Sequence, residues 1–224
     1  MALSNSKREG PHTWDHQESF RMRPIEASDA PIVAIWYKQL EDISIFDRQT
    51  PLPLNHTDVV SLVESLVNNQ EKEKCRWFVT ETAAGDPVGM GGLECINLLH
   101  GHAIMPIFIA EPWRRSGIGI RMACMIVDLA FKQLRLNRVA TVHRADNNAS
   151  ELLLNRLGFT IEGTSRQSWF SQGKYFDMIN VAVLVDEWNQ IRSKLLTELS
   201  SDIIVELGPK PSNIWCWPGR ASIP

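Results

Sequence analysis

One glycine-rich turn gives the first indication of the fold: Arg114-Arg115-Ser116-Gly117-Ile118-Gly119-Ile120, between an apolar run and an apolar helical pattern. Such a turn at the start of a helix aims several backbone N–H groups at one point, where the helix dipole also favours an anion. Gly117 and Gly119 carry no side chain that would keep an anion from the backbone, and the two arginines can add charge-assisted hydrogen bonds. The stretch therefore predicts an anion-binding turn between a strand and a helix.

The turn lacks the marks of the two most familiar phosphate loops. No Gly-Lys-Ser/Thr follows it, as in a Walker A loop, and it has neither the third glycine nor the acidic residue of a dinucleotide fingerprint. These differences argue against kinase and nicotinamide chemistry. A diphosphate held by backbone amides without a metal, as in coenzyme A binding, is the remaining interpretation.

Hydrophobic periodicity on both sides of the turn predicts alternating strands and helices. Pro106 interrupts one apolar run and cannot donate to a strand ladder, so we expect a bulge or a local splay there. The helix after the turn is apolar nearly all round, with a polar stripe of Arg121, Asp128, Lys132 and Arg135, so we expect it to be largely buried. Strands are expected at 20–23, 77–79, 88–95, 102–110 and 139–143, a hairpin at 160–168 and 175–185, and helices at 28–40, 57–69, 119–134, 148–158 and 186–199. The order predicts an α+β chain with a mixed central sheet.

Composition removes several classes of function. The 224 residues carry a net charge of −3, which gives no reason to expect a nucleic-acid partner. No apolar run is long enough for a membrane span, and the polar N-terminus does not resemble a secretory signal. The four cysteines lie far apart without metal-binding spacing, so we expect no metal site and a reducing, cytoplasmic setting.

Three spaced motifs resemble the GNAT N-acetyltransferase superfamily, and more closely its RimJ/RimL-like branch. The first is the apolar strand and glycine-rich turn, residues 107–119. The second is Asn147-Asn148-Ala149-Ser150 followed by Arg156-Leu157-Gly158-Phe159, and the third is Glu162-Gly163, Arg166, Gly173, Tyr175 and Asp177. The resemblance covers about residues 20–185, so we expect a flexible leader at 1–19, a GNAT domain at 20–185, and a C-terminal helix with a Trp-containing tail at 186–224.

The resemblance implies an α/β/α sandwich with a mixed, mostly antiparallel sheet that is splayed at the cofactor site, and acetyl-coenzyme A as acetyl donor. In the family the pantetheine amides pair with the strand before the turn, here around Phe108 and Ile109, and an N–H near Ile109 polarises the thioester. The pyrophosphate lies on the turn. The cofactor-binding residues so implied are Phe108, Ile109, Arg114, Arg115, Ser116, Gly117, Ile118, Gly119, Ile120 and Asn147. For Asn147, a simple turn or capping role is the alternative.

The catalytic groups are less clear, because the tyrosine that many family members use as general acid is replaced by Leu154. The resemblance implies Ser150 as its substitute, against the alternative of an ordinary hydroxyl in the first turn of a helix. Glu94 is the best remaining carboxylate for a general base, although a solvated edge position is equally compatible with the sequence. His102 and His143 stay as weaker candidates, and a chain of water without a dedicated base is also open.

The acceptor is implied to be a primary amine, either a small molecule or a protein N-terminus. We expect Trp169 and Phe170, before the hairpin turn, to be exposed in the acceptor groove, and Asp177 to bind the amine electrostatically. The alternative function is a non-catalytic coenzyme-A-binding or scaffold module, suggested by the missing tyrosine. For the tail, with Trp215 and Trp217, two roles are open: covering the domain's own surface or forming a homodimer contact.

Overall fold

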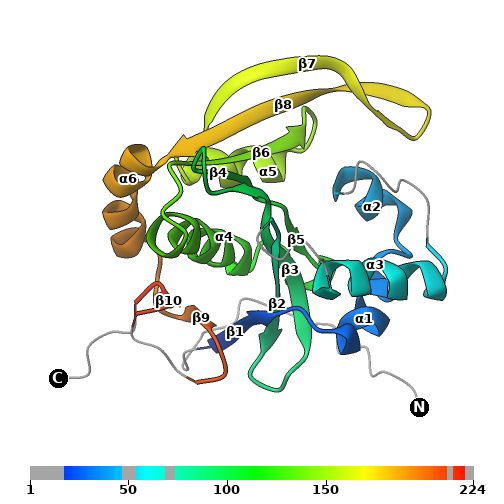
Figure 1. Ribbon diagram of the computed structural model, residues 1–224, viewed down its shortest axis with the longest axis horizontal. Coiled ribbons are helices and arrows are strands. Elements are labelled where there is room, and N and C mark those ends of the chain that lie inside the picture. The colour runs from blue at the N-terminus through cyan, green and yellow to red at the C-terminus, as the bar shows by residue number, and fades with distance from the viewer. Residues whose placement is uncertain (1–17, 47–53, 69–73, 211–213, 220–224) are drawn as a thin grey trace.

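A mixed, mostly antiparallel sheet forms the centre of the protein in a computed structural model that describes residues 18–46, 54–68, 74–210 and 214–219 (Figure 1). Its order over these residues is β10-β9-β1-β2-β3-β4-β6-β8-β7, with β5 attached to β3 alone. Only the β1/β9 and β4/β6 pairs are parallel. The strands are β1 (Glu18–Pro24), β2 (Arg76–Thr82), β3 (Pro87–Asn97), β4 (His102–Ile104), β5 (Ile107–Ile109), β6 (Arg138–Arg144), β7 (Thr160–Ser171), β8 (Lys174–Leu184), β9 (Ile203–Leu207) and β10 (Cys216–Trp217).

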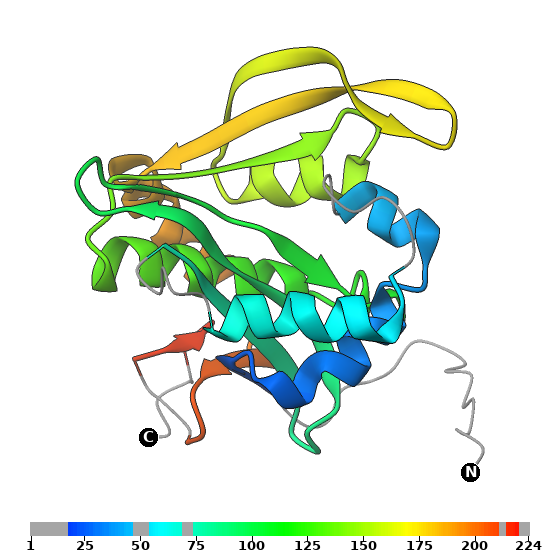
Figure 2. The same ribbon diagram turned by 45° about the vertical axis from the view of Figure 1, so that its right-hand side comes forward.

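Helices cover both faces of this sheet, which confirms the α+β class (Figures 1 and 2). One core cluster includes residues of α4, α5 and α6, and a second cluster joins α1 and α3 to the opposite face through Trp77, Val79 and Phe108. The helices are α1 (Ala30–Trp36), α2 (Leu40–Phe46), α3 (His56–Asn68), α4 (Ile118–Asp128), α5 (Asn148–Arg156) and α6 (Val185–Glu198), with short 3-10 turns at Ala27–Asp29 and Glu111–Trp113. Two helices, α1 and α2, replace the single helix expected at 28–40.

Pro106 splits the apolar run 102–110 into two short strands, as expected from its missing N–H. β4 pairs with both β3 and β6, whereas β5 pairs with β3. The last bond on the β6 side runs from the N–H of Met105 to the carbonyl of Ala140 at 2.8 Å. β6 continues to Arg144 without β5 beside it, so the sheet is splayed between these two strands.

The helix after the glycine-rich turn is largely buried, as its apolar sequence predicts. α4 ends at Asp128, and a π-helical turn, Leu129–Gln133, follows it. Even Arg121 and Asp128 of its polar stripe are buried, at 4% and 2% exposed. Two segments cover them: α6 lies over Asp128, and the segment after α6, described at 199–210 and 214–219 and here called the C-terminal arm, lies against α4 and contacts both residues.

The C-terminal arm completes the sheet and is fixed by a buried carboxylate. β9 runs parallel to β1, and β10 adds to β9. Asp128 accepts hydrogen bonds from the indoles of Trp188 at 2.9 Å and Trp217 at 3.0 Å, and from Arg192 at 2.8 Å. Trp217 is 1% exposed and packs against Trp188. Trp217 therefore covers the surface of its own domain, which is one of the two roles left open for the tail.

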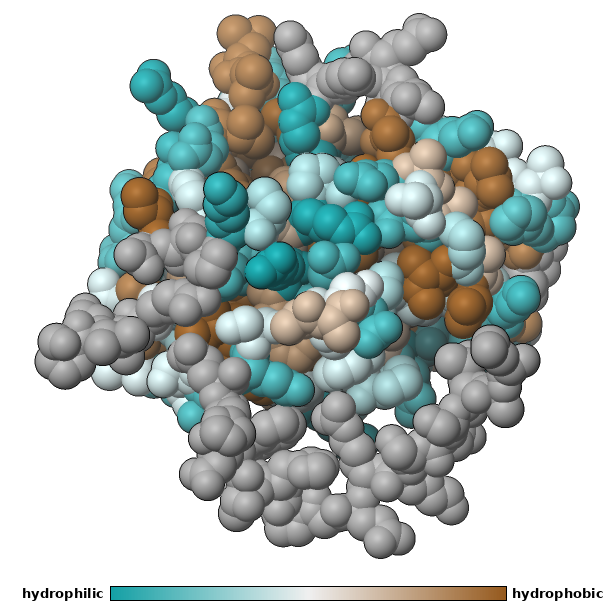
Figure 3. All heavy atoms as spheres, turned by 90° about the horizontal axis from the view of Figure 1, so that it is seen from below, coloured by the Kyte–Doolittle hydropathy of each residue, from teal (hydrophilic) through white to brown (hydrophobic). Residues whose placement is uncertain are grey.

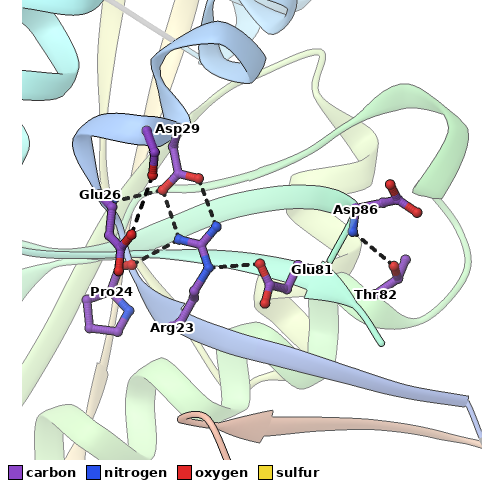
Figure 4. A network of polar contacts seen from close by, with 8 residues as sticks. Arg23, Pro24, Glu26, Asp29, Glu81, Thr82 and Asp86 are labelled. Carbon is purple, nitrogen blue, oxygen red and sulfur yellow. Dashed lines mark hydrogen bonds and ion pairs between the residues drawn. The ribbon is translucent and has the colours of Figure 1, made fainter. Parts of the chain in front are cut away.

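A second polar network joins β1 to β2 and to the turn before α1 (Figure 4). Arg23 donates two hydrogen bonds to Asp29, at 2.8 and 2.9 Å, and a third to Glu81 at 2.8 Å. The hydrogen bonds to Asp29 and Glu81 raise the pKa of Arg23, and they outweigh partial burial, which would lower it. Together these bonds hold the entry to α1 on the sheet.

The surface drawn in Figure 3 interleaves hydrophilic residues with several separate groups of hydrophobic ones. Within the described ranges, every helix is too short or too polar to pass through a lipid bilayer. The same residues hold no group of three or more metal-ligating side chains.

Candidate functional site

The glycine-rich turn, residues 114–120, here called the cofactor turn, has the backbone shape that the sequence predicts for an anion site. Arg115 and Gly117 have φ values of 61° and 89°, and α4 begins at Ile118. The Ser116 hydroxyl donates to the carbonyl of Trp113 at 2.6 Å and accepts from the N–H of Ile118 at 3.3 Å, which fixes the turn. The N–H of Ile118 is thus used within the turn, and the N–H groups that follow it in the first helical turn have no partner within the helix and are oriented for an anion.

The two arginines of the turn differ in their contacts. Arg114 donates from Nε to the carbonyl of Ile109 at 3.0 Å and forms an ion pair with Asp42 of α2 at 2.8 Å. Its guanidinium also lies 5.9 Å from the ring centroid of Phe108. Arg114 therefore ties the turn to β5 and α2, whereas Arg115 is exposed beside the turn.

The splay between β5 and β6 leaves backbone groups of β5 directed at the opening. The Gly92–Pro106 and Ala110–Val88 hydrogen bonds to β3 set the alternation of this antiparallel ladder. By that alternation the backbone groups of Phe108 face β3, and those of Ile109 face the splay. Of the two residues expected to pair with pantetheine, only Ile109 therefore faces the opening. Its carbonyl already accepts a hydrogen bond from Arg114, so the N–H is the backbone group that it presents there.

A glycine makes this close pairing of β5 with β3 possible. A Cβ on Gly89 would lie 2.4 Å from the carbonyl oxygen of Phe108. Any side chain there would push β5 away from β3, and the cofactor turn that follows β5 would move with it.

The start of α5 lies at the end of β6, on the other side of the splay. Asn147 is the N-cap, and its side-chain oxygen accepts from the N–H of Ser150 at 3.1 Å. The capping alternative thus describes what the Asn147 side chain does in this structure. Ser150 is half-buried in the first turn of α5, while Leu154 is 4% exposed and belongs to the core.

The base candidates lie on β3 and β6. Glu94 is half-buried and accepts from the indole of Trp77 at 3.1 Å, so it is not a solvated edge residue. His143 is 5% exposed, and its Nδ1 lies 3.0 Å from the carbonyl of Arg144. His143 also lines a cavity of about 140 Å³ together with Glu151 and Leu154 of α5. His102 is half-buried on β4.

The hairpin of β7 and β8 differs from the expectation at Trp169. This side chain was expected to be exposed but is 6% exposed, because its indole donates to the carbonyl of Ser44 at 2.9 Å. Phe170 is 56% exposed, as expected, and stacks on Tyr175 with ring centroids 4.9 Å apart. Within the pair 169–170, only Phe170 presents an open ring.

Asp177 shapes the hairpin next to an open hollow of about 660 Å³, which Arg166, Gln167 and Asp177 line. The register slips between Ser165 and Trp169, and Gln167 has a φ of 50°. The Asp177 carboxylate accepts from the N–H of Gln167 at 2.8 Å and so holds this bulge. The site residue assigned to amine binding therefore has a structural contact as well.

The sequence reading missed α2, which connects the cofactor turn to the hairpin. Its Asp42 pairs with Arg114, and the carbonyl of Ser44 accepts from Trp169 and, at 3.4 Å, from Arg144. Arg144 is anchored by Asp146 and lies 4.3 Å from the ring centroid of Phe176 on β8. The acidic pair Glu41-Asp42 followed by apolar residues was the one local sign of a second helix start.

Comparison with known proteins agrees with this geometry. A family model described as an acetyltransferase (GNAT) domain matches residues 19–160. The chain is 31% identical over 113 residues to the uncharacterized N-acetyltransferase YoaA of Bacillus subtilis, covering 48% of this chain and 61% of that protein. It is 21% identical over 180 residues to the spermidine N(1)-acetyltransferase of Escherichia coli K12, covering 76% of this chain and 88% of that protein.

Solved structures share the fold. The spermidine N-acetyltransferase of Vibrio cholerae, crystallised with CoA and spermine, superposes with a TM-score of 0.69 at 21% identity. The superposition covers 76% of this chain and 98% of that one. The mixed, splayed sheet described above is thus the fold of that protein too.

Proposed function

The chain belongs to the GNAT acetyltransferase family, and we propose that it transfers the acetyl group of acetyl-coenzyme A to a primary amine. One observation carries the proposal: the splay between β5 and β6 opens beside a helix N-terminus built for a diphosphate. Residues 115–120 would hold the pyrophosphate, and the free edge of β5 would pair with the pantetheine amides. This donor set is made of backbone amides and fits coenzyme A without a metal.

We propose direct attack of the amine on the thioester. The amine nitrogen forms a bond to the acetyl carbon, the carbon–sulfur bond breaks, and the thiolate takes up a proton. The N–H of Ile109 faces the splay and would stabilise the oxyanion. The reaction also needs one group that accepts the amine proton and one that donates to the thiolate.

Ser150 and Glu94 are the proposed proton carriers. Ser150 lies at the first turn of α5, one turn before Leu154, where many family members have a tyrosine. Its backbone N–H donates to Asn147, which fixes the residue at the start of α5, and its hydroxyl would serve as the proton donor. Glu94 lies on β3, the strand next to β4, and accepts a hydrogen bond from Trp77 of β2. It would accept the amine proton directly or through water.

The acceptor is proposed to be a small amine that enters at the hollow under the hairpin. Three relatives are named for spermidine, which makes polyamines the first acceptors to test. The hollow also carries Arg166 beside Asp177, a pair of opposite charges that suits an amine bearing a carboxylate. The panel should therefore contain polyamines, amino acids and peptide N-termini.

Two measurements on the purified protein test the proposal. Acetyl-coenzyme A at 100 times its dissociation constant should stabilise the fold by about 2.7 kcal/mol in a thermal-shift titration. Thiol release, followed with a colorimetric reagent, should then rise in the presence of an acceptor from the panel. Stabilisation without thiol release on any amine would favour the non-catalytic module, and no stabilisation at all would refute coenzyme A binding.

A further inference from the structure

Arg121 is a buried guanidinium that contacts the backbone of the cofactor turn. It is 4% exposed, and its Nη1 donates to the carbonyl of Gly117 at 2.9 Å. Its Nη2 donates to the carbonyl of Ser200 at 2.6 Å, in the C-terminal arm. Its Nε is buried without a hydrogen-bond partner, and among the described residues no carboxylate forms an ion pair with it.

This position is unfavourable for a cation in the free protein. A positive charge in the first turn of a helix opposes the helix dipole, and burial without a carboxylate partner adds a desolvation cost. Burial accordingly lowers the pKa of Arg121. An anion bound at the N-terminus of α4 would offset both costs, because it would supply the missing negative charge close to the guanidinium.

The guanidinium also occupies the space in which a side chain at residue 117 would lie. Its Nη1 is 2.6 Å from the position of a Cβ added to Gly117. Gly117 is the N-cap of α4, with a φ of 89°. Its carbonyl orientation sets the direction of the adjoining N–H groups, so the bond from Arg121 holds those donors in place.

We infer that Arg121 is a positioning residue for the cofactor turn, and that the C-terminal arm takes part in cofactor binding through its bond to Arg121 at Ser200. The inference rests on the proposed function. Arg121 does not touch the pyrophosphate: it fixes the Gly117 carbonyl from behind and adds positive potential at the anion site. The arm, which lies outside the matched family segment 19–160, would then be needed for full affinity.

The test compares two acetyl donors with two variants. Acetyl-coenzyme A carries the pyrophosphate, whereas S-acetylpantetheine lacks it but has the same reacting end. For Arg121→Met we expect KM for acetyl-coenzyme A to rise about tenfold, as for the loss of one charge-assisted bond, with kcat within about twofold. The kinetics with S-acetylpantetheine should change less than about twofold. Arg121→Lys keeps the charge and should lie between Arg121→Met and the original protein.

Arg135→Met is the matched control, since it removes the same charge from an exposed position after the π-helical turn. Its KM for acetyl-coenzyme A should stay within about twofold of the original. Amide hydrogen exchange gives an independent readout: added CoA should slow exchange at residues 199–202, and Arg121→Met should abolish that protection.

Equal losses on both donors would show a general folding effect and overturn the inference, as would an unchanged KM in Arg121→Met. If Arg121→Met does not fold, as judged by circular dichroism, the Arg121→Lys comparison decides in the same way. If the original protein neither binds CoA nor releases thiol, the proposed function fails first. Binding by the original protein with no effect in the variants refutes the role of Arg121 alone.

Discussion

Replacing Asp128 by asparagine tests the carboxylate that joins α4, α6 and the C-terminal arm. One oxygen accepts from Trp188 and Arg192, and the other accepts from Trp217, Arg192 and Lys132. An asparagine at this position has only one accepting oxygen, and its NH₂ group would point at N–H donors with which it cannot form a hydrogen bond. At least one indole N–H loses its partner, at about 1–3 kcal/mol, and Arg192 loses its counter-charge.

The expected cost of Asp128→Asn is about 3 kcal/mol. This lies at the low end for breaking a buried ion pair, because the Arg192 side chain is 26% exposed and partly screened. For a chain of this size the melting temperature should fall by roughly 6–12 °C. Urea unfolding, followed by far-ultraviolet circular dichroism, measures the change in the free energy of unfolding.

A matched control makes the same chemical change at the surface. Glu162 pairs with Arg138, both side chains are partly exposed, and Glu162→Gln should cost less than about 1 kcal/mol. Arg192→Met, alone and combined with Asp128→Asn, should give a coupling energy above about 1 kcal/mol. The reasoning is refuted if Asp128→Asn costs no more than Glu162→Gln, or if the two changes at 128 and 192 are additive.

Four further predictions concern pH, the cofactor turn, the proton donor and the hairpin. Burial alone would raise the pKa of Asp128, but hydrogen bonds from Arg192, Trp188 and Lys132 outweigh burial and lower this pKa below its ordinary value of 3.8. The ionised Asp128 therefore contributes its full stabilisation above about pH 4 and loses it as the pH falls through the lowered pKa. In urea titrations at acid pH, the difference in stability between the original protein and Asp128→Asn should disappear. Gly117→Ala should raise the Kd for CoA at least about tenfold in calorimetry, because a Cβ would meet Arg121 and the residue has a positive φ; an unchanged Kd would contradict this. Ser150→Ala should lower kcat about 10²-fold or more and alter its pH profile, with the KM for acetyl-coenzyme A unchanged; unaltered kcat would remove Ser150 from the mechanism. Trp169→Phe should cost about 1–2 kcal/mol in urea unfolding, since the Ser44 carbonyl loses the shorter of its two hydrogen bonds and keeps only the one from Arg144 at 3.4 Å; a neutral effect would show that the Trp169 contact does not hold α2.

The parts of the fold that could be predicted depend on neighbours in sequence. Pro106 lacks an N–H, so the break between β4 and β5 follows from one residue, and the structure confirms it. The glycines and the helix start of the cofactor turn are likewise local. The motifs were enough to indicate the family because they are defined by residue types and their spacing along the chain, which do not depend on tertiary contacts.

The errors came from contacts between distant residues. Trp169 is buried because it meets Ser44, which lies 125 positions earlier in the chain. Asp128 and Arg121 form a polar stripe within their own helix, and they are buried because α6 and the C-terminal arm cover them. A pattern of hydrophobicity within one helix carries no information about a segment 80 residues later, so burial of these two charges could not be predicted.

The pairing of β9 with β1 has a consequence for how the protein is made. β1 is the first described strand to be synthesised and β9 is the ninth, so this edge of β1 stays unpaired until β9 has been made. Phe20 and Met22, which are 1% and 0% exposed in the folded protein, belong to this strand β1. Pairing strands so far apart in sequence carries a high loop-closure entropy and is slow. The nascent chain therefore offers one unpaired edge of an apolar strand until residues 203–207 are available, and an open strand edge is prone to pair with other chains.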